Sequence, residues 1–168
     1  LLLSRTSPEL FKMQLGNVDV VAIAQKVITD LYGKIEDKQQ DISLDGESAF
    51  LMSTEFTLYT LLQNLIANAC AYSPNEAVIK VSVSQNEKNT VICVDDSGPG
   101  IDESERENVL KRFYRDQYQD KYKSTGSGLG LAIVGQIVTM HKGRIELDTA
   151  PIGGLRVQVV LPNLSDVE

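Results

Sequence analysis

The sequence has little histidine and cysteine, which limits the metal chemistry it can support. It contains one His, two Cys and no Trp. Zinc and iron–sulfur sites are built from several Cys or His ligands, so the composition excludes them, and any metal would be a hard cation on oxygen ligands. Cys70 and Cys93 each lie in an apolar run. We expect them to be reduced core thiols rather than a disulfide pair.

Long hydrophobic runs are also missing. No stretch approaches the roughly 20 apolar residues that span a bilayer, and residues 1–3 are too short for the core of a signal peptide. We therefore expect no membrane contact by this segment. The 16 Lys and Arg stand against 23 Asp and Glu, a net charge of −7. Because duplex binding depends on clustered Lys and Arg, we expect no nucleic acid partner, although a local basic patch could bind a small polyanion.

The sequence does contain enough apolar residues, at helical and strand spacing, to form the core of one folded domain. The chain has 168 residues, of which 42% are hydrophobic. Apolar spacing predicts helices over about 19–37, 53–72 and 129–141 and a short polar helix over 102–112. Alternation predicts strands at 78–83 and 90–94, joined as an antiparallel hairpin, and further strands near 144–147 and 156–161.

Two segments between these elements have a less regular pattern. Ile42 to Leu44 and Phe50 to Leu51 predict two short strands around a turn at Asp45-Gly46. Residues 112–128 show no periodicity and predict a long loop, which is a candidate lid over a ligand.

Asn64, Asn68 and Tyr72 follow one another at four-residue spacing on the predicted helix 53–72, so they align along one edge of its apolar face. One interpretation is that the amides satisfy nearby backbone groups, because a buried amide without partners is costly. The other is that a carboxamide oxygen coordinates Mg²⁺, which prefers oxygen ligands and keeps substrate phosphates in its shell.

The segment Asp96-Ser97-Gly98-Pro99-Gly100 directly follows a predicted strand. It is either an ordinary glycine turn or a ligand site. In a ligand site the glycines would let the backbone approach a planar ligand, and the carboxylate would accept from an exocyclic amine such as that of adenine.

Gly126, Gly128 and Gly130 open the helix predicted over 129–141. A helix start offers unpaired N–H groups and positive dipole character, which suit a phosphate. A P-loop would need Gly-Lys-Ser/Thr here, and a dinucleotide fold would need a parallel βαβ unit; the sequence offers neither.

Taken in this order, the segments resemble the sequence boxes of sensor histidine kinases. NLIANACAYSP (64–74) is similar to their asparagine box, VDDSGPGI (94–101) to the first glycine box, KRFYR (111–115) to the phenylalanine box and TGSGLGLAIV (125–134) to the second glycine box; the terminal GG…VVLP (153–162) also matches. The resemblance covers about residues 19–162.

The resemblance implies a Bergerat-type ATP-binding fold. This fold is an α/β sandwich, with a mixed, mostly antiparallel sheet packed on one layer of helices and the nucleotide between helices and lid. The implied division is the end of a dimerisation helix and linker over 1–18, an ATP-binding catalytic domain over 19–162 and a tail over 163–168.

The resemblance also implies an activity. The domain would bind ATP and Mg²⁺ and transfer the γ-phosphoryl group to a histidine on the dimerisation domain of the same protein, which would be a homodimer at full length. A response regulator receiver domain would then be the signalling partner. The implied location is a cytoplasmic domain of a bacterial inner-membrane sensor. The segment by itself is expected to bind nucleotide but to show little autophosphorylation.

Site roles follow from motif position within the resemblance. Asn68 would ligate Mg²⁺, Asn64 would assist at the metal and phosphates, and Asp96 would bind the adenine amino group. The remaining base contacts would come from Tyr72, Gly98, Gly100 and Ile101, and the phosphate and lid contacts from Lys121, Lys123, Thr125, Gly126, Ser127, Gly128, Leu129, Gly130 and Leu131. Arg115, which follows Arg112 and Phe113, would reach the γ-phosphate or the acceptor domain.

Two positions depart from the family pattern, and a third carries the single histidine of the sequence. Ala71 stands where the family usually has Lys or Arg, so one phosphate-facing cation is missing, and we expect Lys121 or Lys123 to substitute for it. Leu155 stands where Thr is usual, which should affect packing only. His141 falls at the end of a predicted helix, where a cation is favoured, and we expect a structural or capping role rather than a phosphoacceptor.

Two alternatives stay open. The first is a regulatory nucleotide-binding module, or an ATPase clamp of the topoisomerase and chaperone type. Such clamps use a Glu as base on the asparagine-box helix, where this chain has Asn64, and its Glu55 lies three turns away from Asn68. The second is a degenerate scaffolding domain. Asn68, Asp96 and the glycine boxes argue against that reading, and Ala71 keeps it open.

Overall fold

The computed structural model describes residues 8–114 and 127–163 of the chain. The elements, in chain order, are α2 (Pro8–Met13), β1 (Gly16–Asp19), α3 (Val20–Asp37), β2 (Asp41–Asp45), β3 (Phe50–Ser53), α4 (Glu55–Tyr72), β4 (Val78–Gln85), β5 (Asn89–Asp96), α5 (Glu103–Phe113), α7 (Ser127–Met140), β6 (Arg144–Thr149) and β7 (Leu155–Pro162). No described helix is long and apolar enough to cross a membrane.

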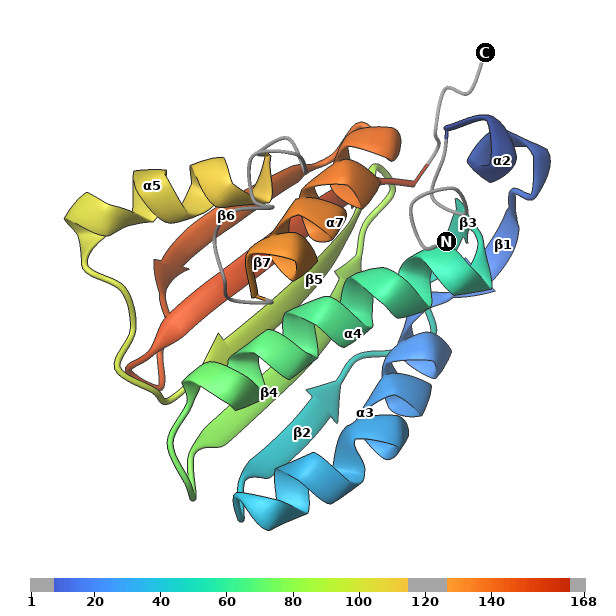
Figure 1. Ribbon diagram of the computed structural model, residues 1–168. Helices are drawn as coiled ribbons and strands as arrows, with labels where there is room; N and C mark the ends of the chain where they lie inside the picture. Colours follow the sequence, from blue (N-terminus) through green and yellow to red (C-terminus); the bar gives the residue numbers. More distant parts are fainter. Residues whose placement is uncertain (1–7, 115–126, 164–168) are drawn as a thin grey trace.

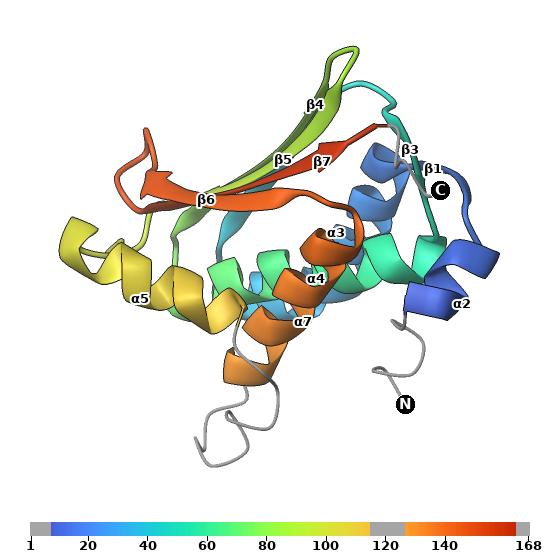
Figure 2. The same ribbon diagram turned by 90° about the horizontal axis from the view of Figure 1, so that it is seen from above.

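The main sheet has five strands in the order β2-β4-β5-β7-β6. Strand β2 pairs parallel with β4, and the other neighbours are antiparallel. Helices α3, α4, α5 and α7 cover one face of this sheet, and Figure 2 shows them as a single layer beneath it. The predicted α/β sandwich with a mixed, mostly antiparallel sheet is therefore confirmed, including the hairpin of β4 and β5.

The core lies between the helix layer and the sheet, where the apolar periodicity of the sequence predicts it. Leu58, Leu61 and Leu62 of α4 are fully buried, as are Ile79 of β4 and Ile92 of β5. Each such side chain stabilises the fold by roughly 1.5–3 kcal/mol through burial. Helix α4 begins at a side-chain cap, because the Thr57 N–H donates to Thr54 Oγ1 at 3.0 Å. These contacts hold α4 along the sheet (Figure 1).

The strands on either side of Asp45-Gly46 do not form the hairpin that the sequence suggests. Strand β2 joins the main sheet, whereas β3 pairs with β1 in a separate two-stranded sheet. Gly46 has φ +142° and lies so close to the Val83 carbonyl that a Cβ atom would overlap it. The glycine therefore permits a close crossing over β4 rather than a tight turn between paired strands.

Part of the segment predicted as a linker belongs to the folded body. Strand β1 (Gly16–Asp19) pairs antiparallel with β3, and the Phe11 side chain of α2 is 3% exposed. Its ring packs edge-on against the His141 ring, with centroids 4.8 Å apart. Residues from about Phe11 onward are thus tied to α7, which the sparse apolar residues of this stretch did not indicate.

Both cysteines are free and buried, as predicted. Burial raises the pKa of the Cys70 thiol, and burial together with the nearby Asp95 raises the pKa of Cys93 to about 11. Both thiols are therefore protonated near neutral pH and pack as small apolar groups.

His141 is a structural residue, but it is not the cationic cap that we expected. Its ring is 1% exposed. Nδ1 lies 2.8 Å from the Ile137 carbonyl and Nε2 lies 2.9 Å from Ser53 Oγ. Because a carbonyl can only accept, Nδ1 carries the proton and Nε2 accepts from the Ser53 hydroxyl. Burial lowers the pKa of His141, so the neutral ring links α7 to β3.

The lowered pKa of His141 predicts an acid-sensitive contribution to stability. The unfolded chain binds a proton at His141 below its ordinary pKa of 6.5, whereas the folded ring does not. Stability present above pH 6.5 is therefore lost as pH falls toward the lower folded pKa, by up to about 1.4 kcal/mol per pH unit. Urea unfolding between pH 5.5 and 7.5 gives the free energy of unfolding at each pH. This free energy should rise more steeply with pH for the wild type than for His141→Gln. Parallel curves would contradict this prediction.

Candidate functional site

An apolar cavity of about 340 Å³ opens beside the carboxyl end of β5. Its wall comes from α4, α5, the start of α7 and the ends of β5 and β7, which meet there in Figure 1. The apolar lining is Leu65, Ala69, Val94, Pro99, Ile101, Val109, Phe113, Leu131, Leu155 and Val157, and the polar lining side chains are Asn68, Tyr72, Asp96 and Arg112. A mostly apolar pocket with a few placed polar groups suits a flat organic ligand.

Asp96 is the oriented polar group of this cavity. Its Oδ1 accepts from the Gly98 N–H at 2.9 Å and from the Leu155 N–H at 3.1 Å. Its Oδ2 accepts no hydrogen bond from the described residues. The backbone of Gly154 approaches so closely that a Cβ there would overlap Asp96 Oδ1. Two N–H groups therefore fix one carboxylate oxygen and leave the other available to a ligand donor.

The two asparagines of α4 have different surroundings. Asn64 Nδ2 donates to the Thr60 carbonyl at 2.8 Å, which is the backbone-satisfying role considered above. Asn68 Nδ2 is buried and has no hydrogen-bond partner among the described residues. Because an unpaired buried donor is costly, the Asn68 amide is better explained by a ligand than by the fold.

A clamp of two side chains holds the end of α4. Lys38 Nζ donates to the carbonyls of Cys70 at 2.9 Å and Ser73 at 2.6 Å. Gln40 Nε2 donates to the same Cys70 carbonyl at 3.0 Å and to the Pro74 carbonyl at 3.1 Å. The last carbonyls of a helix lack partners within it, so this clamp satisfies them and fixes the turn that carries Tyr72.

A second, more open cavity of about 810 Å³ lies between α3, α4 and the first turn of α7. Its lining includes Lys34, Asp37, Lys38, Asn64, Asn68, Ala71, Tyr72 and Gly130. It shares Asn68 and Tyr72 with the apolar cavity. Gly130 sits against Asn64, since a Cβ there would be 2.7 Å from Asn64 Oδ1. The two cavities together suit a ligand with an apolar flat end and a charged end.

The structure brings most of the predicted site residues together. Asn68, Tyr72, Asp96, Gly100, Ile101 and Leu131 line the apolar cavity, Asn64 and Gly130 line the open one, and Gly98 contacts Asp96. Ser127, Gly128 and Leu129 form the first turn of α7. Arg115, Lys121, Lys123, Thr125 and Gly126 lie outside the described residues.

The sequence analysis missed several lining residues. Lys34 lies on α3 and Lys38 caps its end, far from the motifs in sequence, and Val109 is an ordinary apolar residue. Leu155, which we expected to affect packing only, also lines the apolar cavity and donates its N–H to Asp96. No local pattern marks Lys34, Lys38 or Val109, because only the packing of α3 and α5 brings them to the cavities.

Within the described residues, no group of three or more His, Cys, Asp or Glu side chains could hold a metal ion. Among the described residues that α4 contributes to the open cavity, the side-chain oxygens that could ligate a metal are the carboxamide oxygens of Asn64 and Asn68. Two neutral oxygens suit Mg²⁺ when ligand phosphates and water complete its shell, so the residues present fit a magnesium ion that arrives with a phosphate ligand.

Comparisons with known proteins agree with this geometry. A family model described as "Histidine kinase-, DNA gyrase B-, and HSP90-like ATPase" matches residues 53–165. The sensor protein kinase PmrB of Pseudomonas aeruginosa is 34% identical over 163 residues, which are 96% of this chain and 34% of that protein. The chain therefore spans about a third of the length of this relative.

Solved structures match over nearly the whole chain. The mycobacterial sensor histidine kinase MprB aligns with a TM-score of 0.71 and 26% identity, covering 90% of this chain and 99% of that one. Full-length ShkA in complex with AMPPNP aligns with a TM-score of 0.74 and 20% identity, covering 92% of this chain and 32% of that one.

Proposed function

The chain belongs to the family of histidine kinase-, DNA gyrase B- and HSP90-like ATPases, as the catalytic ATP-binding domain of a sensor histidine kinase, and we propose that it binds Mg·ATP and transfers the γ-phosphoryl group to a histidine of the same protein's dimerisation domain. The observation that carries the proposal is Asp96, which faces an apolar cavity with one carboxylate oxygen held and the other available.

Adenine is the ligand group that best matches the apolar cavity. Its exocyclic amine would donate to Asp96 Oδ2, and its ring would lie between apolar walls that include Ile101 and Leu131. Gly100 has φ +72°, a backbone conformation that glycine adopts without strain, and it keeps the wall free of a side chain. The cavity would thus select the base by one directed hydrogen bond and by shape.

The phosphates would extend along α4 into the open cavity, past Asn68 and Asn64. These two residues would hold Mg²⁺, which supplies charge neutralisation on the phosphate oxygens when bound. The first turn of α7 reaches this cavity at Gly130, and a helix N-terminus favours phosphate through its unpaired N–H groups and dipole.

The site favours transfer to a protein acceptor over hydrolysis. None of the α4 residues that line the two cavities carries a carboxylate that could activate water. The turn before Asn68 carries Asn64 instead. Phosphoryl transfer then depends on positioning and charge stabilisation. The proposed acceptor is a dimerisation domain in a homodimeric full-length protein, the proposed downstream partner is a response regulator receiver domain, and the proposed location is the cytoplasmic side of a bacterial inner membrane.

The proposed function is tested by calorimetric titration of the chain with the non-hydrolysable analogue AMP-PNP, with and without Mg²⁺. Binding that tightens with Mg²⁺ is expected. Incubation of the chain with Mg·ATP and a separately produced dimerisation domain should then phosphorylate that domain on histidine. Failure to bind AMP-PNP at millimolar concentration would contradict nucleotide binding. Binding without histidine phosphorylation would favour the regulatory module instead.

Asn68→Ala should separate ligand binding from stability. We expect the affinity for Mg·AMP-PNP to fall about tenfold or more, to the value seen without Mg²⁺. The melting temperature without ligand should stay level or rise, because the substitution removes a buried Nδ2 donor that has no partner in the described part of the chain. Gln63→Ala on the exposed side of α4 is the matched control and should change neither quantity. A Mg²⁺ dependence that survives Asn68→Ala would remove this residue from the metal site.

A further inference from the structure

We propose that Lys34 of α3 supplies the positive charge for the phosphate end of the nucleotide. This inference rests on the proposed nucleotide binding. It is an alternative to our expectation that Lys121 or Lys123, which lie outside the described residues, compensates for Ala71. Lys34 is placed for the role by the packing of α3 against α4, and nothing in its local sequence marks it.

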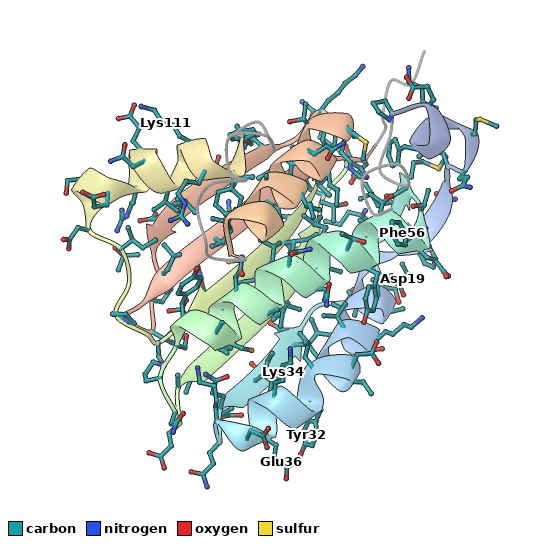
Figure 3. The ribbon with its side chains drawn as sticks, in the orientation of Figure 1. Asp19, Tyr32, Lys34, Glu36, Phe56 and Lys111 are labelled. Atoms are coloured by element: carbon teal, nitrogen blue, oxygen red, sulfur yellow. The ribbon has the colours of Figure 1, made fainter. Side chains whose placement is uncertain are left out.

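The position of Lys34 is the first observation. Figure 3 shows Lys34 on the side of α3 toward α4, whereas Tyr32 and Glu36 lie on the outer side. Lys34 lines the open cavity together with Asn64 and Asn68. Packed helix axes are about 8–10 Å apart, a separation that a lysine side chain on one helix can cross.

The charges in the open cavity are the second observation. Its charged lining residues are Lys34, Asp37 and Lys38, which leave a net positive charge. Lys38 is committed to the carbonyls at the end of α4. Among the described residues, no carboxylate lies within ion-pair distance of Lys34. Its ammonium group is therefore the cation that remains available to an anion entering this cavity.

The shape of the cavity is the third observation. Ala71 lines it, but its methyl group offers neither charge nor hydrogen-bond donor. Figure 1 shows α3 and α7 on opposite sides of α4, and the open cavity is lined by Lys34 from α3 and by Gly130 from the first turn of α7. A phosphate group over Asn68 would therefore have a helix N-terminus on one side and the Lys34 ammonium group on the other. Both groups favour negative charge.

The test is the effect of Lys34→Gln on three ligands, measured by calorimetry with Mg²⁺. AMP-PNP should bind about fivefold to twentyfold more weakly, because a charge-assisted contact is lost at a partly solvated site. ADP should lose less, and adenosine should bind as it does to the wild type. Adding Ala71→Lys to Lys34→Gln should restore the affinity for AMP-PNP, since it returns a cation to the same cavity from α4.

Lys26→Gln is the matched control on the same helix. Lys26 Nζ lies 5.8 Å from the centroid of the Tyr59 ring and does not line either cavity, so this change should leave all three affinities unaltered. Unchanged AMP-PNP binding by Lys34→Gln would overturn the role of Lys34 and leave the proposed function intact. Equal losses for adenosine and AMP-PNP would also overturn it. A wild type that binds none of the ligands would overturn the proposed function itself.

Discussion

Asp96→Asn is expected to weaken AMP-PNP binding by about 100-fold. The backbone N–H groups of Gly98 and Leu155 both point at Asp96 Oδ1, so a substituted amide must keep its oxygen there. Its NH₂ group would then occupy the place of Oδ2 and face the amine of adenine. One charge-assisted hydrogen bond, worth about 1.5–3 kcal/mol, is lost, and two donors are brought together. Each 1.4 kcal/mol corresponds to a factor of ten in affinity. The lost hydrogen bond and the repulsion between the two donors together therefore weaken binding by about two orders of magnitude.

A change of base preference would separate this effect from misfolding. Inosine triphosphate carries a carbonyl in place of the adenine amine, so the wild-type carboxylate should repel it. The NH₂ group introduced by Asp96→Asn should donate to that carbonyl. We therefore expect the variant to bind inosine triphosphate at least as well as AMP-PNP, a reversal of the wild-type order. Calorimetry of both ligands with both proteins measures it, and an unchanged order would exclude a contact between Asp96 and the base.

The residue before Asp96 gives the matched control. Asp95 points to the opposite face of the sheet, where its two oxygens pair with Arg156 Nε and Nη2 at 2.8 Å each. Asp95→Asn removes the same charge one residue away and weakens that ion pair. We expect somewhat lower stability and unchanged nucleotide affinity. If the two variants lost affinity equally, the general charge of the strand, rather than the cavity, would explain the result.

Local patterns predicted most of the fold, because most elements are amphipathic and end at clear signals. Helix α4, for example, begins at the Thr54 cap and ends before Pro74, and the alternation in β4 and β5 predicted their hairpin. The pairing of β2 and β3 was predicted wrongly, although both strands were expected from the sequence. Strand β2 pairs in parallel with β4, more than 30 residues further on, and no local pattern can indicate such a partner. The Asp45-Gly46 pair therefore suggested a hairpin, whereas the chain passes there from the main sheet to the two-stranded sheet.

The same limit applies to the candidate site. Asn68 and Asp96 could be chosen from sequence because each belongs to a compact motif on one element. The clamp of Lys38 and Gln40 could not, since it joins the end of α3 to the end of α4 across 30 residues of chain. Lys34 is a similar case. Motifs identify residues that touch a ligand from a local segment, whereas residues contributed by packing need the fold.

The contact between α5 and α7 leads to the largest expected effect on stability. Gly135 lies in the middle of α7, and a Cβ there would overlap the Phe113 carbonyl at the end of α5. Gly135→Ala must push the two helices apart. Overpacking of this kind costs typically 1–3 kcal/mol, and the clash is with backbone, which cannot turn aside. We expect a net loss of about 2 kcal/mol, even though alanine favours the helix by about 1 kcal/mol.

Gly33→Ala provides the comparison that isolates this clash. Gly33 is also a mid-helix glycine, but no described atom outside the adjacent turns of its own helix lies within 4 Å of its missing Cβ, so alanine should stabilise α3 by up to about 1 kcal/mol. Urea unfolding should therefore move the midpoint in opposite directions for the two variants. Gly135→Ala should also weaken AMP-PNP binding, because Val109, Arg112 and Phe113 of α5 line the apolar cavity. Equal shifts of the two midpoints would show that α5 and α7 yield to the added methyl group, and that α5 can move away from the nucleotide at little cost.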